Sequence, residues 1–155
     1  MLEIERKFIV NSLAFKKEAT KQTRIVQAYL NTHPERSVRI RIKGDKGVLT
    51  IKGKGNALGT TRFEWEKEIS LADAESLLPL CEKGSIHKTR FEIPNGNHVF
   101  EVDEFYDDNE GLIIAEVELQ NETEVFQKPA WLGKEVTGVK KYYNSQLTKR
   151  PYNEW

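Results

Sequence analysis

The sequence has little cysteine and no long apolar run. Cys81 is the only cysteine among 155 residues, so the chain forms no internal disulfide, as is usual in a reducing compartment. No apolar stretch approaches the roughly 20 residues that a membrane-spanning helix needs. The first residues are charged and unlike a signal peptide. These absences predict a cytoplasmic protein without a membrane partner.

The chain also lacks a net charge and the usual metal and phosphate motifs. Lys+Arg and Asp+Glu both number 24, whereas nucleic-acid binders show a basic excess, so no nucleic acid is expected. His33, His87 and His98 do not have the spacing of zinc ligands. The "GKG" at 53–55 is not followed by Ser or Thr at the spacing of a phosphate-binding loop. A bound phosphate would therefore have to be held by side chains.

Size and composition predict one folded domain. Of the 155 residues, 38% are apolar and 31% are charged, which is rich in charge but still sufficient for a core. No internal repeat or linker-like composition divides the chain. We therefore expect a single domain over residues 1–155.

Most of the chain alternates between apolar and polar residues, which is the pattern of half-buried strands. The turn signals "GDKG" at 44–47, "GNALG" at 55–59 and "PNGN" at 94–97 predict hairpins and hence antiparallel neighbours. The expected strands are 2–10, 25–31, 37–43, 47–54, 62–69, 87–93, 98–105 and 112–119.

Fewer segments have helical character. Ser70 is a suitable N-cap for a helix over 70–80, which Pro79 should end or bend. Further short helices are expected at 12–23, 121–127 and 139–147. The predicted fold is α+β, an eight-stranded antiparallel β-barrel that forms a tunnel with a charged interior and a few flanking helices.

The polar faces of the strands carry full charges that are sorted by sign. The segments 37–43 and 47–54 present basic residues, whereas 62–69, 98–105 and 112–119 present acidic ones. The strands of a sheet with one solvent-exposed face also alternate between apolar and polar residues. However, a face that needs only to be soluble is better served by positive and negative charges mixed together. Segregated signs suggest a ligand that has its own pattern of charge.

These residue types indicate metal and phosphate chemistry. Carboxylates without His or Cys suit Mg²⁺ or Mn²⁺, and rows of Arg and Lys suit phosphate. If all charged faces point inward, acidic strands facing basic strands form a wet site for a metal–polyphosphate. "EIERK" at 3–7 carries both signs, so the first strand is expected at the junction of the two halves.

The motifs in this order resemble the CYTH superfamily, also called triphosphate tunnel metalloenzymes. "EIERK" is similar to the ExExK motif of the family, and the likeness spans nearly the whole chain. The other matching motifs are "RIR" at 39–41, "TIKGK" at 50–54, "EWE" at 64–66, "KTRF" at 88–91, "EVD" at 101–103, "EVE" at 116–118 and "EVTGVKKYYN" at 135–144.

The resemblance implies a tunnel enzyme that hydrolyses a triphosphate with Mg²⁺ or Mn²⁺, and the start of the chain is most similar to the bacterial inorganic tripolyphosphatase branch. The implied metal ligands are Glu3, Glu5, Glu64, Glu66, Asp103, Glu116 and Glu118. The implied substrate-binding residues are Lys7, Tyr29, Arg39, Arg41, Lys52, Lys54, Lys88 and Arg90. Lys52 or Lys88 is the expected general base, and Glu5 is the third residue assigned to catalysis.

Other activities remain open at this point. A nucleoside or thiamine triphosphatase or a class IV adenylyl cyclase would need an aromatic platform on which the base stacks. Tyr29 and Phe105 are expected on the same strand faces as the charged residues and could stack in this way. A non-catalytic polyphosphate-binding module would need the basic rows but not the acidic ones. The expected partner is a small-molecule triphosphate, and uncovered apolar strand faces would allow a homodimer.

Overall fold

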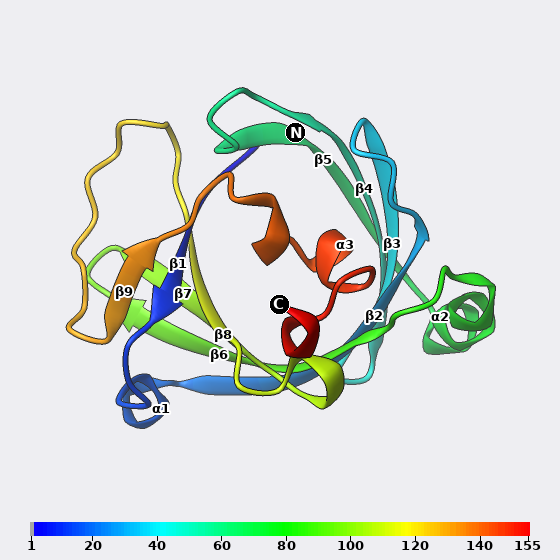
Figure 1. Cartoon of the computed structure of the whole chain (residues 1–155), viewed down its shortest axis with the longest axis horizontal. Coiled ribbons are helices and arrows are strands. Elements are labelled where there is room, and N and C mark those ends of the chain that lie inside the picture. Colours follow the sequence, from blue (N-terminus) through cyan, green and yellow to red (C-terminus); the bar gives the residue numbers. More distant parts are fainter. Residues whose placement is uncertain (1) are drawn as a thin grey trace.

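The computed structural model describes residues 2–155 and shows one antiparallel sheet closed into a barrel (Figure 1). The order of the strands is β5-β4-β3-β2-β6-β7-β8-β1, and a β5–β1 pairing closes the ring; β9 adds to the edge of β1. The strands are β1 (Leu2–Val10), β2 (Lys21–Asn31), β3 (Arg36–Lys43), β4 (Lys46–Gly55), β5 (Thr61–Ile69), β6 (Ile86–Asn95), β7 (His98–Phe105), β8 (Ile113–Glu118) and β9 (Leu132–Glu135). The predicted eight-stranded barrel is confirmed.

Hairpin turns set the register of most neighbours. The predicted hairpins β3–β4, β4–β5 and β6–β7 are all present and antiparallel. Gly44 and Gly96 sit in two of these turns with φ of +62° and +61°, a conformation that glycine adopts without steric cost. Closure depends instead on distant segments, because β1 pairs with β5 through Leu2↔Phe63 and with β8 through Glu5↔Glu118.

The helices are short and lie outside the wall or inside the ring. Ser70 caps α2 by accepting a hydrogen bond from the backbone N–H of Asp73 at 3.0 Å, as the sequence predicted. Pro79 lies in the 3₁₀ turn that follows this helix. The helices are α1 (Phe15–Glu18), α2 (Leu71–Leu77) and α3 (Asn144–Leu147), with 3₁₀ turns η1 (Leu78–Leu80), η2 (Asp107–Asn109), η3 (Lys140–Tyr142) and η4 (Tyr152–Glu154).

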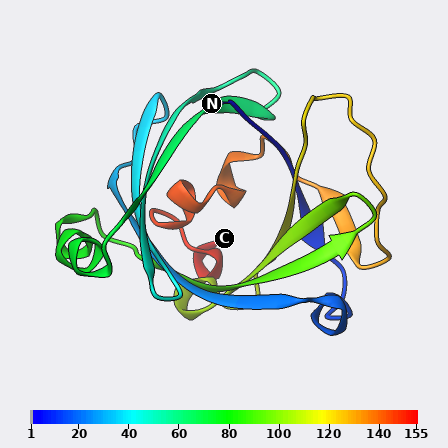
Figure 2. The same cartoon turned by 180° about the vertical axis from the view of Figure 1, so that it is seen from behind.

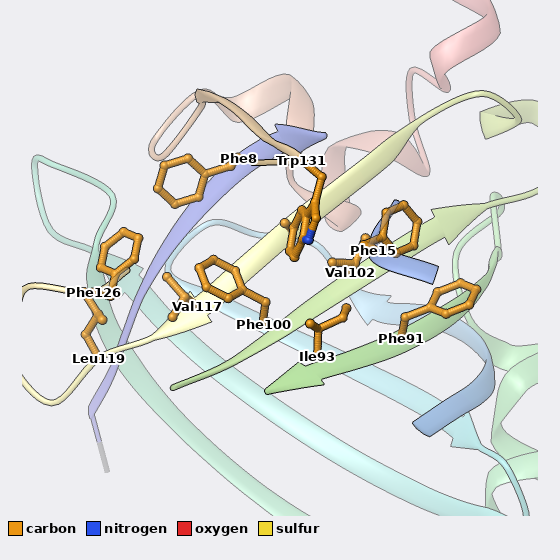
Figure 3. Packing of buried hydrophobic residues seen from close by; sticks show 11 residues of the cluster. Phe8, Phe15, Phe91, Ile93, Phe100, Val102, Val117, Leu119, Phe126 and Trp131 are labelled. Atoms are coloured by element: carbon orange, nitrogen blue, oxygen red, sulfur yellow. The ribbon is translucent and has the colours of Figure 1, made fainter. Parts of the chain in front are cut away.

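The main hydrophobic core lies on the outside of the barrel. Outward residues of β1, β6, β7 and β8 are covered by α1 and by the segment 120–131 (Figure 3). Trp131 is 2% exposed, and the centroid of its ring is 5.5 Å from that of Phe100 and 5.9 Å from that of Phe15. This outer cover leaves the inner face of the same strands available for polar groups.

The C-terminal segment, residues 139–155, turns into the barrel and forms a plug. Its helical turns lie inside the ring in both views (Figures 1 and 2). Leu147 packs with the inward residues Ile86, Phe105 and Ile114, so this part of the interior is apolar. Gly59 in the β4–β5 turn lies close to the plug and to the residue before it: a Cβ there would be 2.9 Å from the hydroxyl of Tyr143 and 2.5 Å from the Cα of Gly138.

Several local predictions were wrong. Residues 121–127 form no helix; Phe126 packs against the rings of Phe8 and Phe100 at 5.9 and 6.0 Å and draws this segment over the barrel. Only Phe15–Glu18 is helical within the expected helix at 12–23. The expected helix at 139–147 is broken at the extended Tyr143, and β9 was not predicted. No helix within residues 2–155 is long and apolar enough to cross a membrane.

The outer core generates a test of stability. Trp131→Ala removes the ring between the α1 residue Phe15 and the β7 residue Phe100, so the free energy of unfolding should fall by about 3–5 kcal/mol. Val125→Ala is the matched control, because Val125 lies in the same covering segment but is 88% exposed; its effect should stay within about 0.5 kcal/mol. Urea unfolding measures both, and equal losses would contradict this position of the core.

Candidate active site

The barrel encloses a polar cavity of about 230 Å³, far above the volume of about 15 Å³ that one water molecule needs. All eight barrel strands and the plug contribute to its wall, which carries eight Lys and Arg side chains and seven Glu side chains. The lining residues are Glu3, Glu5, Lys7, Tyr29, Ser37, Arg39, Arg41, Lys43, Thr50, Lys52, Arg62, Glu64, Glu66, Lys88, Arg90, Glu101, Glu116, Glu118, Tyr143, Asn144 and Ser145.

The wall divides into two arcs of opposite charge. The neighbouring strands β7, β8, β1 and β5 carry all seven lining glutamates and form the acidic arc. The neighbouring strands β6, β2, β3 and β4 form the basic arc, and among the lining residues within 2–155 only the cations Lys7 and Arg62 come from the acidic arc. The expected position of the first strand was wrong: β1 lies within the acidic arc, between β8 and β5, and not at a junction.

Ion pairs connect the arcs at both junctions. Between β4 and β5, the Lys52 Nζ lies 3.1 Å from a carboxylate oxygen of Glu64. Between β6 and β7, the Arg90 guanidinium donates to both oxygens of Asp103, at 2.8 and 2.9 Å. The Lys88 Nζ lies 2.8 Å from the same carboxylate. Opposite charges thus compensate one another in a protein interior that would otherwise penalise each of them.

Glutamates crowd together within the acidic arc. Burial and the neighbouring Glu116 and Glu3 raise the pKa of Glu5 to about 8. Burial also opposes the ionisation of Glu116, but Lys7 and a hydrogen bond from Glu5 outweigh it and hold the pKa of Glu116 well below its usual range. Burial raises the pKa of Glu118, and Glu3 adds to that rise. Such carboxylates are stabilised in their ionised form by a cation.

This donor set fits a hard divalent cation. Mg²⁺ and Mn²⁺ prefer carboxylate oxygens, and such an ion would relieve the mutual repulsion of Glu5 and Glu116. Two of these carboxylates are paired with lysines in the structure: Lys52 Nζ lies 2.7 Å from Glu3, and Lys7 Nζ lies 3.4 Å from Glu116. Within residues 2–155, no group of three or more His, Cys, Asp or Glu residues already converges as a metal cluster. Binding would therefore require rearrangement of these ion pairs.

Cations crowd together within the basic arc. Burial, with Arg39 and Arg90 nearby, lowers the pKa of Arg41 to about 9. The Nε of Arg39 is buried and has no hydrogen-bond partner within the described residues. Buried polar groups are normally paired, so this donor suits an anion in the cavity.

Lys88 is the most strongly buried of the predicted site residues. It is 1% exposed, and burial, with Arg90 and Arg41 adding to its effect, lowers the pKa of Lys88 to about 7. Its ammonium donates to Asn144 Oδ1 at 2.8 Å and pairs with Asp103. A lysine whose pKa is close to neutral can exchange a proton near physiological pH.

Two predicted site residues lie outside the cavity wall. Lys54 is exposed, because β4 changes register between Lys52 and Gly55 and the alternation ends there. Asp103 is 2% exposed and does not line the cavity, because Lys88 and Arg90 bind its carboxylate. All other predicted metal-binding and substrate-binding residues line the cavity. Tyr29 is among them, whereas Phe105 is 1% exposed in the apolar plug cluster and offers no free ring to a base.

Sequence reasoning missed several lining residues. Arg62 lies on the same face of β5 as Glu64, and Glu101 lies on the same face of β7 as Asp103, so alternation alone could have identified both as lining residues. Tyr143, Asn144 and Ser145 had no such signal. They reach the cavity only because the plug folds back into the barrel.

The family model of the CYTH domain matches residues 1–151, and this chain belongs to that family. An inorganic triphosphatase of Acetivibrio thermocellus is 46% identical over 99% of this chain and 97% of its own length. An inorganic triphosphatase of Nitrosomonas europaea is 35% identical over 95% of this chain and 97% of its own.

Solved structures share the architecture. The crystal structure of the inorganic triphosphatase NE1496 has a TM-score of 0.65 at 30% identity, covering 94% of this chain and 93% of that chain. HpAC1 from Hippeastrum, whose dominant activity is described as triphosphatase, has a TM-score of 0.62 and covers 77% of this chain and 80% of that chain. At 17% identity this second likeness shows the fold alone.

The junction between β6 and β7 generates a second test. Asp103→Asn removes the carboxylate that Lys88 and Arg90 share, so the free energy of unfolding should fall by about 3 kcal/mol. Glu68→Gln is the control, because Glu68 pairs with Lys46 at 3.9 Å and its side chain is 65% exposed; its effect should be under about 1 kcal/mol. Chemical unfolding curves at pH 7 measure both. An equally small loss for Asp103→Asn would mean that other carboxylates compensate the two cations.

Proposed function

We propose that this chain hydrolyses inorganic tripolyphosphate to diphosphate and phosphate in a reaction that depends on a divalent metal. The observation that carries the proposal is the acidic arc facing the basic arc across one cavity. Tripolyphosphate with a bound divalent cation has the complementary charges, since its phosphates meet the basic side and its metal meets the acidic side. The two relatives named inorganic triphosphatases support this choice of substrate.

The basic arc binds and orients the phosphates in this proposal. Guanidinium groups match phosphate oxygens through paired N–H donors, and lysines act as point charges. The residues assigned to this role are Lys7, Arg39, Arg41, Lys52, Lys88 and Arg90, with Tyr29 beside them. Lys54 lies outside the wall and can contribute only by attracting the anion.

The acidic arc would hold Mg²⁺ or Mn²⁺ through Glu3, Glu5, Glu116 and Glu118, with Glu64 and Glu66 as further oxygen donors. When bound, the metal supplies Lewis-acid polarisation of phosphate oxygens and compensates charge that develops in the transition state. Asp103 holds Lys88 and Arg90 in place, because both already bind its carboxylate.

Water attacks the terminal phosphorus in line with the departing diphosphate, and the bond from that phosphorus to the bridging oxygen breaks. We assign Lys88 as the base that takes the proton of this water, in preference to Lys52. The lowered pKa of Lys88, about 7, supports that choice, because a base is most effective when its pKa lies near the working pH.

The proposal also includes a cytoplasmic location and a homodimer. A single cysteine supports the location. The outer face of β5 supports association, because the outward ring of Phe63 is 43% exposed.

Hydrolysis should be selective and metal-dependent. Phosphate release is measured from tripolyphosphate, ATP and thiamine triphosphate, each with Mg²⁺, Mn²⁺ or EDTA. Tripolyphosphate should be the fastest substrate, and EDTA should abolish the reaction. Glu5→Gln and Glu118→Gln should each lower kcat by about 100-fold while the protein stays folded.

Glu68→Gln is the matched control for these carboxylates, since the Glu68 side chain is largely exposed and does not line the cavity. It should retain the rate of the unmodified protein. Equal rates with EDTA, or full activity of both Glu5→Gln and Glu118→Gln, would refute the metal assignment. Cyclic AMP produced from ATP would move the assignment to a cyclase.

The base assignment has a separate test. Lys88→Arg keeps the charge but replaces it with a group that does not release its proton. Its kcat should fall by about 100-fold or more, with a smaller change in KM, whereas Lys52→Arg should lose about ten-fold at most. Circular dichroism verifies that both variants fold. A larger loss in kcat for Lys52→Arg than for Lys88→Arg would reverse the assignment.

A further inference from the structure

Asn144, the first residue of α3, connects the plug to the basic arc. Its Oδ1 accepts hydrogen bonds from Lys88 Nζ at 2.8 Å and from Gln27 Nε2 at 2.9 Å. Both partners are donors, which fixes the orientation of the amide: Oδ1 faces Lys88 and Gln27. Asn144 also lines the cavity, so this contact is made at the wall of the proposed site.

Gln27 extends the connection to a second cation. Its side chain is 0% exposed, and its Oε1 accepts a hydrogen bond from Arg41 Nε at 2.8 Å. A continuous chain of hydrogen bonds therefore runs from Lys88 through Asn144 and Gln27 to Arg41. Within the described residues Arg41 has no carboxylate within 4.0 Å, so this chain, rather than an ion pair, fixes its guanidinium.

The plug is anchored on both sides of Asn144. The Tyr143 ring lies under the Lys7 ammonium at 5.0 Å and near the Arg62 guanidinium at 5.9 Å. Leu147, which is 1% exposed, is held in the apolar cluster with Phe105. Asn144 thus approaches the wall from a segment whose own position is well determined.

We propose that Asn144 is a positioning residue for phosphate binding, which aligns Lys88 directly and Arg41 through Gln27. The inference rests on the proposed function and extends it: the basic arc reaches its binding geometry only when the plug is docked. Without these hydrogen bonds the side chains of Lys88 and Arg41 could rotate, and they would lose more conformational entropy on binding an anion. Loss of the chain should therefore raise KM more than it lowers kcat.

The test compares Asn144→Leu, Gln27→Met and the double variant. Each substitution keeps a similar size and removes the amide. KM and kcat are measured for tripolyphosphate with Mg²⁺, and its Kd is measured by calorimetry in EDTA. Each single variant should raise KM and Kd about ten-fold, as expected for hydrogen bonds to charged groups. The Kd of the double variant should remain within about three-fold of the higher of the two single-variant Kd values, because the effects of neighbours in one network are not additive.

Gln146→Ala is the control on the same helix; no hydrogen bond is formed by its side chain within the described residues, and its Kd should change less than about two-fold. Gln27→Met leaves the sequence of the plug and the Lys88–Asn144 hydrogen bond intact, so it keeps the test decisive if Asn144→Leu unfolds. Kd values of the single variants equal to that of the unmodified protein, or effects that multiply in the double variant, would overturn the inference. Failure of the unmodified protein to bind or hydrolyse tripolyphosphate would instead overturn the proposed function on which it rests.

Discussion

The compensation of opposite charges across the tunnel is the constraint on which the rest of the structure depends. An interior lined with cations on one arc and carboxylates on the other is stable only while each side stays close to the other. The pairs at the two junctions, Lys52 with Glu64 and Arg90 with Asp103, hold the arcs together. Charges away from the junctions, such as Arg41 and Glu5, are less well compensated. The same imbalance that costs stability creates affinity for a ligand that carries both signs.

This constraint explains why the core lies outside. The inner faces of the strands are polar, so their apolar faces must be buried against other segments. Trp131 and Phe15 provide that cover for β6, β7 and β8. The inner face becomes apolar only where the plug fills it around Leu147. The fold thus keeps two separate apolar clusters, one outside the barrel and one around the plug, and leaves a polar cavity inside the barrel.

Alternation in the sequence was sufficient to identify the eight barrel strands, though not β9, and which of their side chains face inward, because a period of two is a local property. It failed where local geometry interrupts the period: Lys54 was expected in the cavity, but β4 changes register between Lys52 and Gly55. It also could not give the order of strands around the ring, since β1 meets β5 through Glu3↔Arg62, a pairing of distant segments. Asn144 was missed for the same reason, because only the plug's return into the barrel brings it to Lys88.

The position of β1 between β5 and β8 has a consequence for biosynthesis. β1 is synthesised before its partners, because it pairs with Phe63 on β5 and with Glu118 on β8, which follow much later in the chain. The local hairpins β3–β4 and β6–β7 can form during translation, whereas closure waits for β8. Until then the edge of β1 that pairs with β8 has no partner, and such an edge is exposed to aggregation. Pairings of such long sequence separation fold slowly, so ring closure is the expected slow step in the appearance of the native protein.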